Sequence, residues 1–108
     1  MTRLDTGNKY RAKRTHSQLC GREFASHAEA TRAEELYLLE RVGQITDLKY
    51  QVPFILCQKP KITITIDFSY NDGGETIYED TKGVLTRDFR TKLAWLKEKF
   101  NITVRLTR

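Results

Sequence analysis

The stretch ITITIDFSYNDGGETIYEDTKG, residues 62–83, decides the fold that we expect for this chain. Its first half alternates between apolar residues (Ile62, Ile64, Ile66, Phe68 and Tyr70) and polar residues (Thr63, Thr65, Asp67 and Ser69). Such alternation is typical of a strand with one buried face. Residues 71–74, Asn-Asp-Gly-Gly, are a strong turn signal, and residues 75–82 form the return strand. We therefore predict a β-hairpin with one apolar and one polar face.

Two amphipathic helices flank this hairpin in the sequence. The first begins at Ser26, which has the S-x-x-E spacing of a capping box with Glu29, and it ends near Gly43. The second is predicted over about residues 86–100, because its apolar residues recur at helical spacing. These residues are Phe89, Leu93, Leu96 and Phe100.

The remaining apolar segments predict three more stretches of strand. Residues 45–50 and 52–57 form a β region, in which Pro53 favours a sheet edge or the start of a strand. Residues 102–106 form a final strand after the second helix. The predicted order is α-β-β-β-α-β, which indicates an α/β fold in a single domain over residues 15–108. Residues 1–14 are polar and basic without a period, and we expect a flexible arm there.

The polar face of the hairpin carries the candidate catalytic residues. If the turn is centred on residues 72–73, Asp67 lies opposite Tyr78 and becomes a diagonal neighbour of Asp80. Lys82 shares this face, two residues beyond Asp80. Two carboxylates and one ammonium group are then expected to converge.

Two alternatives remain open for this face. A turn of three or five residues would bring Glu79 to it in place of Asp80, whereas in the first register Glu79 falls on the apolar face. The face can also be an ordinary solvated surface, on which Asp67 and Lys82 form a cross-strand ion pair.

Paired carboxylates suggest a metal site. Two aspartates at this spacing repel each other unless a cation lies between them, and hard oxygen ligands suit Mg²⁺, with Mn²⁺ as a substitute. A bound cation polarises a phosphoryl oxygen and activates water, while Lys82 can stabilise charge that develops on phosphorus. This combination favours phosphodiester hydrolysis.

Glu29 has two possible roles. As the third residue of a capping box it stabilises the helix start without any catalysis. It also shares a helical face with Ala33 and Leu36, so it points inward, and a buried carboxylate needs a partner. A metal shared with Asp67 would supply that partner, and both roles stay open.

Charge identifies a class of partner. The chain has a formal net charge of +5, concentrated near its start and around the second helix. Lysine and arginine clusters suit a polyanion, because each contact with a phosphate releases condensed counterions. A solvated surface is the ordinary alternative. The candidate DNA-binding residues are Lys9, Arg11, Lys13, Arg14, Arg87, Arg90 and Lys92.

Composition excludes several other classes of protein. Apolar residues make up 39% and charged residues 31% of the chain, a globular balance. No apolar run approaches the roughly 20 residues that span a bilayer, and the N-terminus lacks the apolar stretch of a signal peptide. Cys20 and Cys57 are too few for a disulfide scaffold or a zinc site. We expect a cytoplasmic protein that does not associate with membranes.

The ordered set of acidic residues and lysine resembles the PD-(D/E)xK nuclease superfamily. Asp67 precedes Asp80-Thr81-Lys82 across a hairpin, with Glu29 on the helix before and another helix after. The segments NKYRAKR, FASHAEATRAEELYLLERVGQITDL, ITIDFSY and YEDTKG further resemble a family of short phage and prophage proteins in that superfamily. This resemblance covers nearly the whole chain from Asn8.

The resemblance implies a restriction-endonuclease-like core, a mixed sheet flanked by helices with magnesium at the split in the sheet. It implies that Asp67 and Asp80 bind the metal, that Lys82 is the catalytic lysine and that Glu29 is the helical acid. Ile66 departs from the signature, which has proline at this position.

The resulting hypothesis is a magnesium-dependent endodeoxyribonuclease from a phage or prophage, located in the cytoplasm of a bacterial host. It would act on duplex or branched DNA in recombination or genome processing. Because the chain is short, it has little surface with which to recognise a DNA sequence. This favours an enzyme that is selective for DNA structure, or a homodimer. The alternative is a non-catalytic DNA-binding or protein-interaction module on the same fold, and the choice between DNA and RNA stays open.

Overall fold

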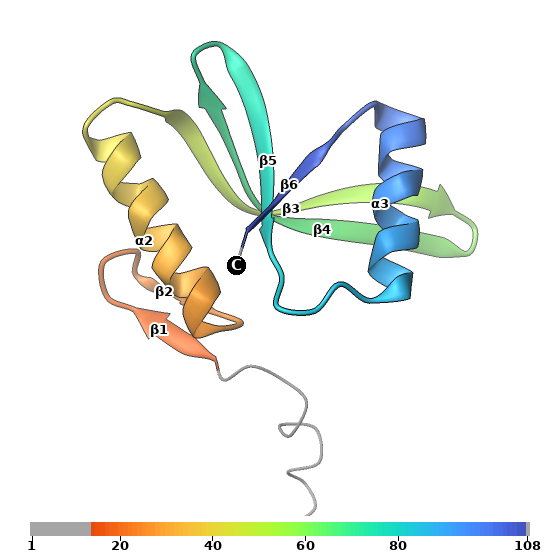
Figure 1. Cartoon of the computed structure of the whole chain (residues 1–108), viewed down its shortest axis with the longest axis horizontal. Coiled ribbons are helices and arrows are strands. Elements are labelled where there is room, and N and C mark those ends of the chain that lie inside the picture. Colours follow the sequence, from red (N-terminus) through yellow and green to blue (C-terminus); the bar gives the residue numbers. More distant parts are fainter. Residues whose placement is uncertain (1–13, 108) are drawn as a thin grey trace, which may run out of the picture.

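The computed structural model describes residues 14–107 of the chain (Figure 1). Its elements are, in order, β1 (Thr15–Ser17), β2 (Arg22–Phe24), α2 (His27–Arg41), β3 (Thr46–Gln58), β4 (Lys61–Asp72), β5 (Glu75–Thr81), α3 (Arg87–Phe100) and β6 (Val104–Thr107). Neither helix in this part of the chain combines the length and apolar character that crossing a membrane requires.

Strands β3 to β6 form one mixed sheet in the order β3-β4-β5-β6. The pairs β3–β4 and β4–β5 are antiparallel, whereas β5–β6 is parallel because α3 carries the chain back to the same end. Helices α2 and α3 lie on either side of β5 (Figure 1), and the cluster under each helix contains a different part of β4. The predicted α/β fold and its α-β-β-β-α-β order are confirmed, and the implied mixed sheet flanked by helices is present.

A small antiparallel hairpin, β1–β2, precedes this core and was not predicted. Each of its strands has three residues, which is too short for an alternating pattern to be recognised. The hairpin packs beside α2, where Ser17 Oγ donates a hydrogen bond of 2.6 Å to Glu34.

The β4–β5 hairpin turns at Gly73 and Gly74, with Asp72 paired to Glu75. Both glycines have positive φ, 62° and 86°, as a two-residue turn of the primed type requires. The predicted register, with Asp67 opposite Tyr78, is therefore wrong by two residues, because the turn uses both glycines and not residues 72–73. A shift of two residues leaves every side chain on its predicted face.

Both helices have the predicted ends. Ser26 Oγ accepts a hydrogen bond of 3.1 Å from the backbone of Glu29 at the start of α2. At its end Gly43 has a φ of 82°, which lets the backbone turn away from the helix axis. Helix α3 begins after Thr86, whose hydroxyl accepts a hydrogen bond from the backbone of Phe89, and it ends at Asn101.

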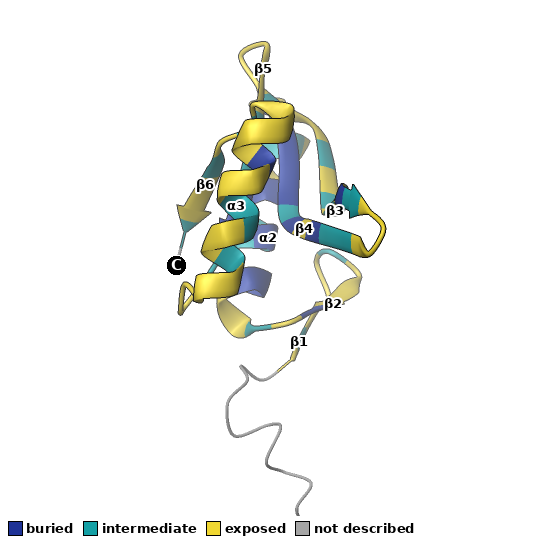
Figure 2. Ribbon diagram, turned by 90° about the vertical axis from the view of Figure 1, so that its right-hand side faces the viewer, coloured by how far each residue is buried: buried dark blue, intermediate teal, exposed yellow. Residues whose placement is uncertain are grey.

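Two apolar clusters fill the space between the helices and the sheet. One contains Phe68 and Tyr70 and lies under α2, while the other contains Ile64 and Ile66 and lies under α3. Figure 2 shows that the outer side of α3 is exposed and that buried residues lie behind it on β4. Asp67 is thus the residue of β4 at which the chain passes from one cluster to the other.

Strand β3 joins the two predicted segments at residues 45–50 and 52–57 into one edge strand, which confirms the edge position of Pro53. Asp47 and Gln51 have positive φ, 57° and 53°, at which the regular strand conformation is interrupted. The sequence pattern had predicted two separate strands with a gap at Gln51.

Candidate functional site

Asp67 and Asp80 are linked directly across β4 and β5. The backbone amide of Asp67 donates a hydrogen bond of 2.8 Å to Asp80 Oδ1, and the backbone amide of Thr81 donates one of 2.9 Å to Asp67 Oδ2. These reciprocal bonds hold the two carboxyl groups side by side. The predicted convergence of Asp67 and Asp80 is confirmed, although the two are closer in register than expected.

Lys82 completes the predicted group of three. Its Nζ lies 3.4 Å from Asp80 Oδ2 and 4.4 Å from the centre of the Phe89 ring. The backbone amide of Lys82 donates to Thr107 at 3.0 Å, so β6 fixes the chain at this point. An ammonium group over an aromatic face is attracted by the ring electrons. Asp80 and Phe89 therefore hold the lysine from two directions.

Asp80 has an unusual environment for a carboxylate. Its side chain is fully buried, and Oδ2 has no hydrogen-bond partner among the described residues. The ammonium group of Lys82 lies near this oxygen, but the contact lacks hydrogen-bond geometry. A buried carboxylate oxygen without a hydrogen bond is costly, and the ion pair with Lys82 offsets only part of that cost.

Glu29 reaches the same region from the first turn of α2. It is 5% exposed, and its Oε2 accepts a hydrogen bond of 3.0 Å from Gln51 Nε2. The same Gln51 nitrogen lies 3.4 Å from Asp67 Oδ1. Glu29 therefore combines the capping position with an inward carboxylate, and Gln51, which sequence analysis missed, connects it to Asp67.

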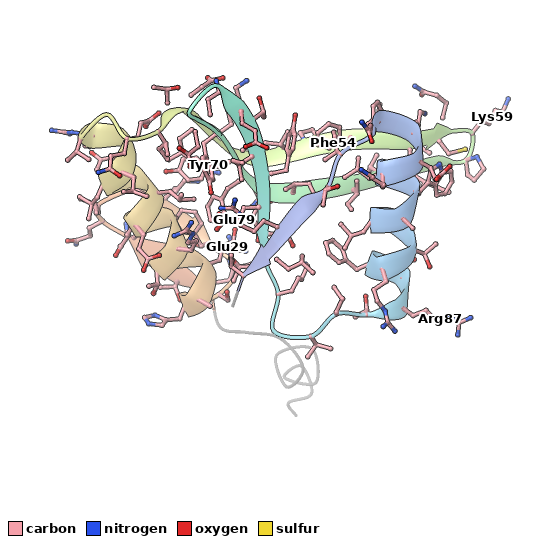
Figure 3. All side chains as sticks on the ribbon, turned by 45° about the horizontal axis from the view of Figure 1, so that its top comes forward. Glu29, Phe54, Lys59, Tyr70, Glu79 and Arg87 are labelled. Carbon is pink, nitrogen blue, oxygen red and sulfur yellow. The ribbon has the colours of Figure 1, made fainter. Side chains whose placement is uncertain are left out.

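Figure 3 labels Glu29 and Glu79 on the α2 side of the sheet. Glu79 lies on the apolar face, as the first register predicted, and is fully buried. It accepts hydrogen bonds of 2.7 Å from the Tyr70 hydroxyl and 3.0 Å from Arg32 Nη2. The guanidinium group of Arg32 turns inward from α2 and neutralises Glu79.

The crowding of acids changes their proton affinity. Burial, followed by the charge of Asp67, raises the pKa of Glu29 from 4.5 to about 7. Burial and the charge of Asp67 also raise the pKa of Asp80 from 3.8 to about 6, against the opposing influence of Lys82. A cation placed among these groups would favour their charged forms.

Two of these acids have the chemistry that a divalent cation requires. Within residues 14–107, no three His, Cys, Asp or Glu side chains are already grouped as a metal site. Magnesium, however, is commonly held by one or two carboxylates together with water and substrate phosphate. Asp67 and Asp80, with the open Oδ2 atom, fit this requirement. Glu29 as a third ligand stays a prediction.

The basic residues proposed for DNA binding lie in two places. Arg87 and Arg90 are exposed in the first turn of α3, which also contains the Phe89 that contacts Lys82. Figure 3 labels Arg87 at the start of this helix. Lys92 Nζ lies 3.7 Å from Asp88 Oδ2. Arg14 forms an ion pair with Glu23, in which Nε lies 3.3 Å from Oε1. Lys9, Arg11 and Lys13 lie outside the described residues, as does most of the predicted arm.

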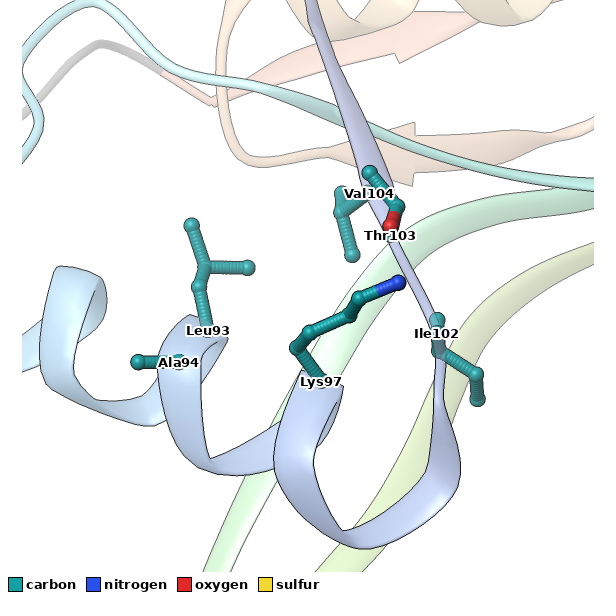
Figure 4. Close-up of a pocket in the computed structure, with 6 residues that line it drawn as sticks. All are labelled: Leu93, Ala94, Lys97, Ile102, Thr103 and Val104. Atoms are coloured by element: carbon teal, nitrogen blue, oxygen red, sulfur yellow. The ribbon is translucent and has the colours of Figure 1, made fainter.

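A cavity of about 260 Å³ opens elsewhere, between α3 and β6 (Figure 4). None of the acids lines it. The lining residues are Leu93, Ala94, Lys97, Ile102, Thr103 and Val104.

Comparison with known proteins identifies one family. The family described as "Protein of unknown function (DUF1064)" matches residues 7–108. The searches of curated proteins and of solved structures found no match. None of these findings names a nuclease superfamily.

Proposed function

We propose that this chain, which belongs to the family described as "Protein of unknown function (DUF1064)", is a metal-dependent endodeoxyribonuclease of the PD-(D/E)xK type. The observation that carries the proposal is the environment of Asp80. This buried carboxylate has an oxygen without a hydrogen bond, is linked to Asp67 and lies 3.4 Å from Lys82 Nζ. Proteins commonly keep a destabilising group of this kind where function requires it.

In this proposal Asp67 and Asp80 hold Mg²⁺, or Mn²⁺ in its place, with Glu29 as the helical acid. When bound, the cation polarises a phosphoryl oxygen and lowers the pKa of an attacking water. Lys82 orients that water and stabilises the negative charge that develops on the phosphate. Its contact with Phe89 keeps the ammonium group at the site while the substrate enters.

DNA is the proposed substrate, duplex or branched. The net charge of +5 favours a polyanion, and the start of α3 places Arg87 and Arg90 close to Lys82 along the chain. A phosphate backbone that reaches Lys82 would therefore meet these arginines next. A restriction-endonuclease-like core, a phage or prophage origin, a cytoplasmic location and a role in recombination or genome processing belong to the same proposal.

The test is cleavage of a labelled panel of linear duplex, flap, four-way junction, single-stranded DNA and RNA, with Mg²⁺, Mn²⁺ or a chelator. We expect metal-dependent cutting of at least one DNA substrate by the wild type. Asp80→Ala and Lys82→Ala should reduce the rate by at least about 100-fold.

The matched control is Asp72→Asn, which changes an exposed aspartate at the turn of the same hairpin and should keep wild-type activity. Circular dichroism of each variant checks that the fold is retained. Salt-sensitive DNA binding without cleavage under either metal would favour the non-catalytic alternative. Cleavage that survives in Asp80→Ala would refute the assigned site.

A further inference from the structure

Gln51 adopts a backbone conformation that a strand residue rarely has. Its φ is 53°, although it lies within β3, between two residues that pair regularly with β4. Tyr50 pairs with Phe68 and Val52 pairs with Ile66, which leaves Gln51 opposite Asp67 but outside the ladder. A positive φ costs a residue other than glycine on the order of 1 kcal/mol or more of folding free energy. Residues in this conformation concentrate at functional sites.

The conformation has a clear consequence for the side chain. Gln51 Nε2 donates to Glu29 Oε2 at 3.0 Å and lies 3.4 Å from Asp67 Oδ1. Glu29 comes from α2 and Asp67 from β4, so one amide group connects acids from two different elements. The two carboxyl groups also contact each other, and Gln51 donates to both of them.

The two carboxylates repel each other when both are charged. This repulsion opposes the contact between Glu29 and Asp67, and a donor shared by both groups reduces it. Gln51 supplies that donor without adding charge. Neutral groups that hydrogen-bond to metal-binding carboxylates orient them and commonly affect metal affinity by about 10–100-fold.

We propose that Gln51 is a positioning residue of the metal site, which holds the Glu29 carboxylate against Asp67 so that both face the same cation. This inference rests on the proposed function, because it concerns the same site. It adds a residue from β3 to a group otherwise drawn from α2, β4 and β5. It also gives a reason for the left-handed backbone at Gln51.

The experiment measures Mn²⁺ affinity by isothermal titration calorimetry on the full chain, in the absence of DNA. The central variant is Gln51→Gly. Glycine accepts a positive φ without strain, and this relief offsets part of the stability lost with the bridging amide, so the variant should still fold. We expect Mn²⁺ to bind at least about tenfold more weakly to a variant whose circular dichroism spectrum matches that of the wild type.

Gln58→Ala is the matched control, because it removes an exposed glutamine at the far end of the same strand. It should leave Mn²⁺ affinity unchanged. A double-mutant cycle with Glu29→Gln tests whether Gln51 affects Mn²⁺ affinity through Glu29. If Gln51 acts by holding Glu29, most of the loss caused by Gln51→Gly should disappear in the Glu29→Gln background.

Wild-type Mn²⁺ affinity in Gln51→Gly would overturn the inference, as would an equal loss in both backgrounds. These outcomes are separate from the fate of the proposed function. A wild type that binds Mn²⁺ and depends on Gln51 but cuts none of the DNA panel would refute the nuclease and keep the positioning role. A wild type that does not bind Mn²⁺ would refute both.

Discussion

At the scale of single residues, the features of Asp80 that we propose for metal binding are in opposition to the stability of the fold. Asp80 is buried, has an oxygen without a hydrogen bond and lies beside a second carboxylate. In the absence of a cation these features destabilise the folded state, since the charge loses its hydration and gains only part of a partner. A substitution that removes the charge should therefore harm activity without harming the fold.

Asp80→Asn tests this opposition. The amide keeps an oxygen that can accept the hydrogen bond from Asp67, but it cannot supply a negative charge to a cation. We expect cleavage to fall by at least about 100-fold. The midpoint of thermal unfolding, measured at pH 8 with a chelator, should be unchanged or higher. A variant with wild-type cleavage, or one that unfolds well below the wild type, would contradict the account.

The raised pKa values predict how stability depends on pH. Folding raises the pKa of Glu29 from 4.5 to about 7 and that of Asp80 from 3.8 to about 6. Between these limits the folded state binds more protons than the unfolded chain, so the free energy of unfolding falls as pH rises. The contribution is fully present below about pH 4 and is lost by about pH 7.

Urea unfolding of the metal-free protein at several pH values measures this dependence. Each proton held only by the folded state contributes up to about 1.4 kcal/mol per pH unit. Glu29→Gln should flatten the slope between pH 5 and 7, because it removes one of the two groups. A stability that increases over this range, or a slope unchanged in Glu29→Gln, would show that these acids do not titrate as described.

At the scale of elements, the pair Arg32–Glu79 joins α2 to β5. Glu79 is fully buried and depends on Arg32 and the Tyr70 hydroxyl for its hydrogen bonds. Because Glu79 precedes Asp80 in the strand, this contact also fixes β5 where it carries the site. Removal of one partner leaves a buried charge uncompensated.

Arg32→Ala should therefore lower the free energy of unfolding by about 3 kcal/mol or more. Arg41→Ala, at an exposed position in the last turn of the same helix, is the control and should change it by less than about 0.5 kcal/mol. Denaturant unfolding of both variants gives the comparison. Equal stability of the two variants would mean that Arg32 and Glu79 do not connect the elements as their contacts indicate.

The sequence predicted the elements whose patterns are local and long. The alternation in β4, the cap at Ser26 and the stop at Gly43 all correspond to the structure. The residues on each hairpin face were also correct, because the error in register was an even number of residues. Asp67, Asp80 and Lys82 could therefore be brought together from the sequence.

What the sequence did not predict depends on contacts between distant segments. Arg32 has the pattern of a solvated position, and only the packing of α2 on β5 turns it toward Glu79. Gln51 lies in a segment with weak alternation, and its role depends on a left-handed φ that glutamine does not signal. Secondary-structure propensity and hydrophobic periodicity depend only on residues that are close in the sequence. They therefore could not reveal the roles of Arg32 and Gln51.

For the whole molecule, the exposed basic residues predict a salt-dependent interaction with DNA. If Arg87, Arg90 and Lys92 contact phosphates, each contact releases counterions. Replacing all three with alanine should reduce the slope of log affinity against log salt by about 2 to 3. Fluorescence anisotropy with a labelled duplex, under non-cleaving conditions with Ca²⁺, measures this slope.

Lys59→Ala with Lys61→Ala is the control for that measurement. Lys59 lies at the tip of the β3–β4 hairpin, away from the start of α3 (Figure 3). The control should change the slope by less than the α3 variant does. A larger change in the control would place the DNA on the hairpin and not at α3. Homodimerisation stays a prediction, which the elution volume of the full chain would test.

The proposed nuclease activity requires one divalent ion held by Asp67 and Asp80, and anomalous scattering from crystals grown with Mn²⁺ tests this directly. We predict a single strong peak about 2.1 Å from a carboxylate oxygen of each aspartate. The peak should be absent from crystals of Asp80→Asn. A peak at another place on the chain, or no peak at Mn²⁺ concentrations that support cleavage, would contradict the proposed site.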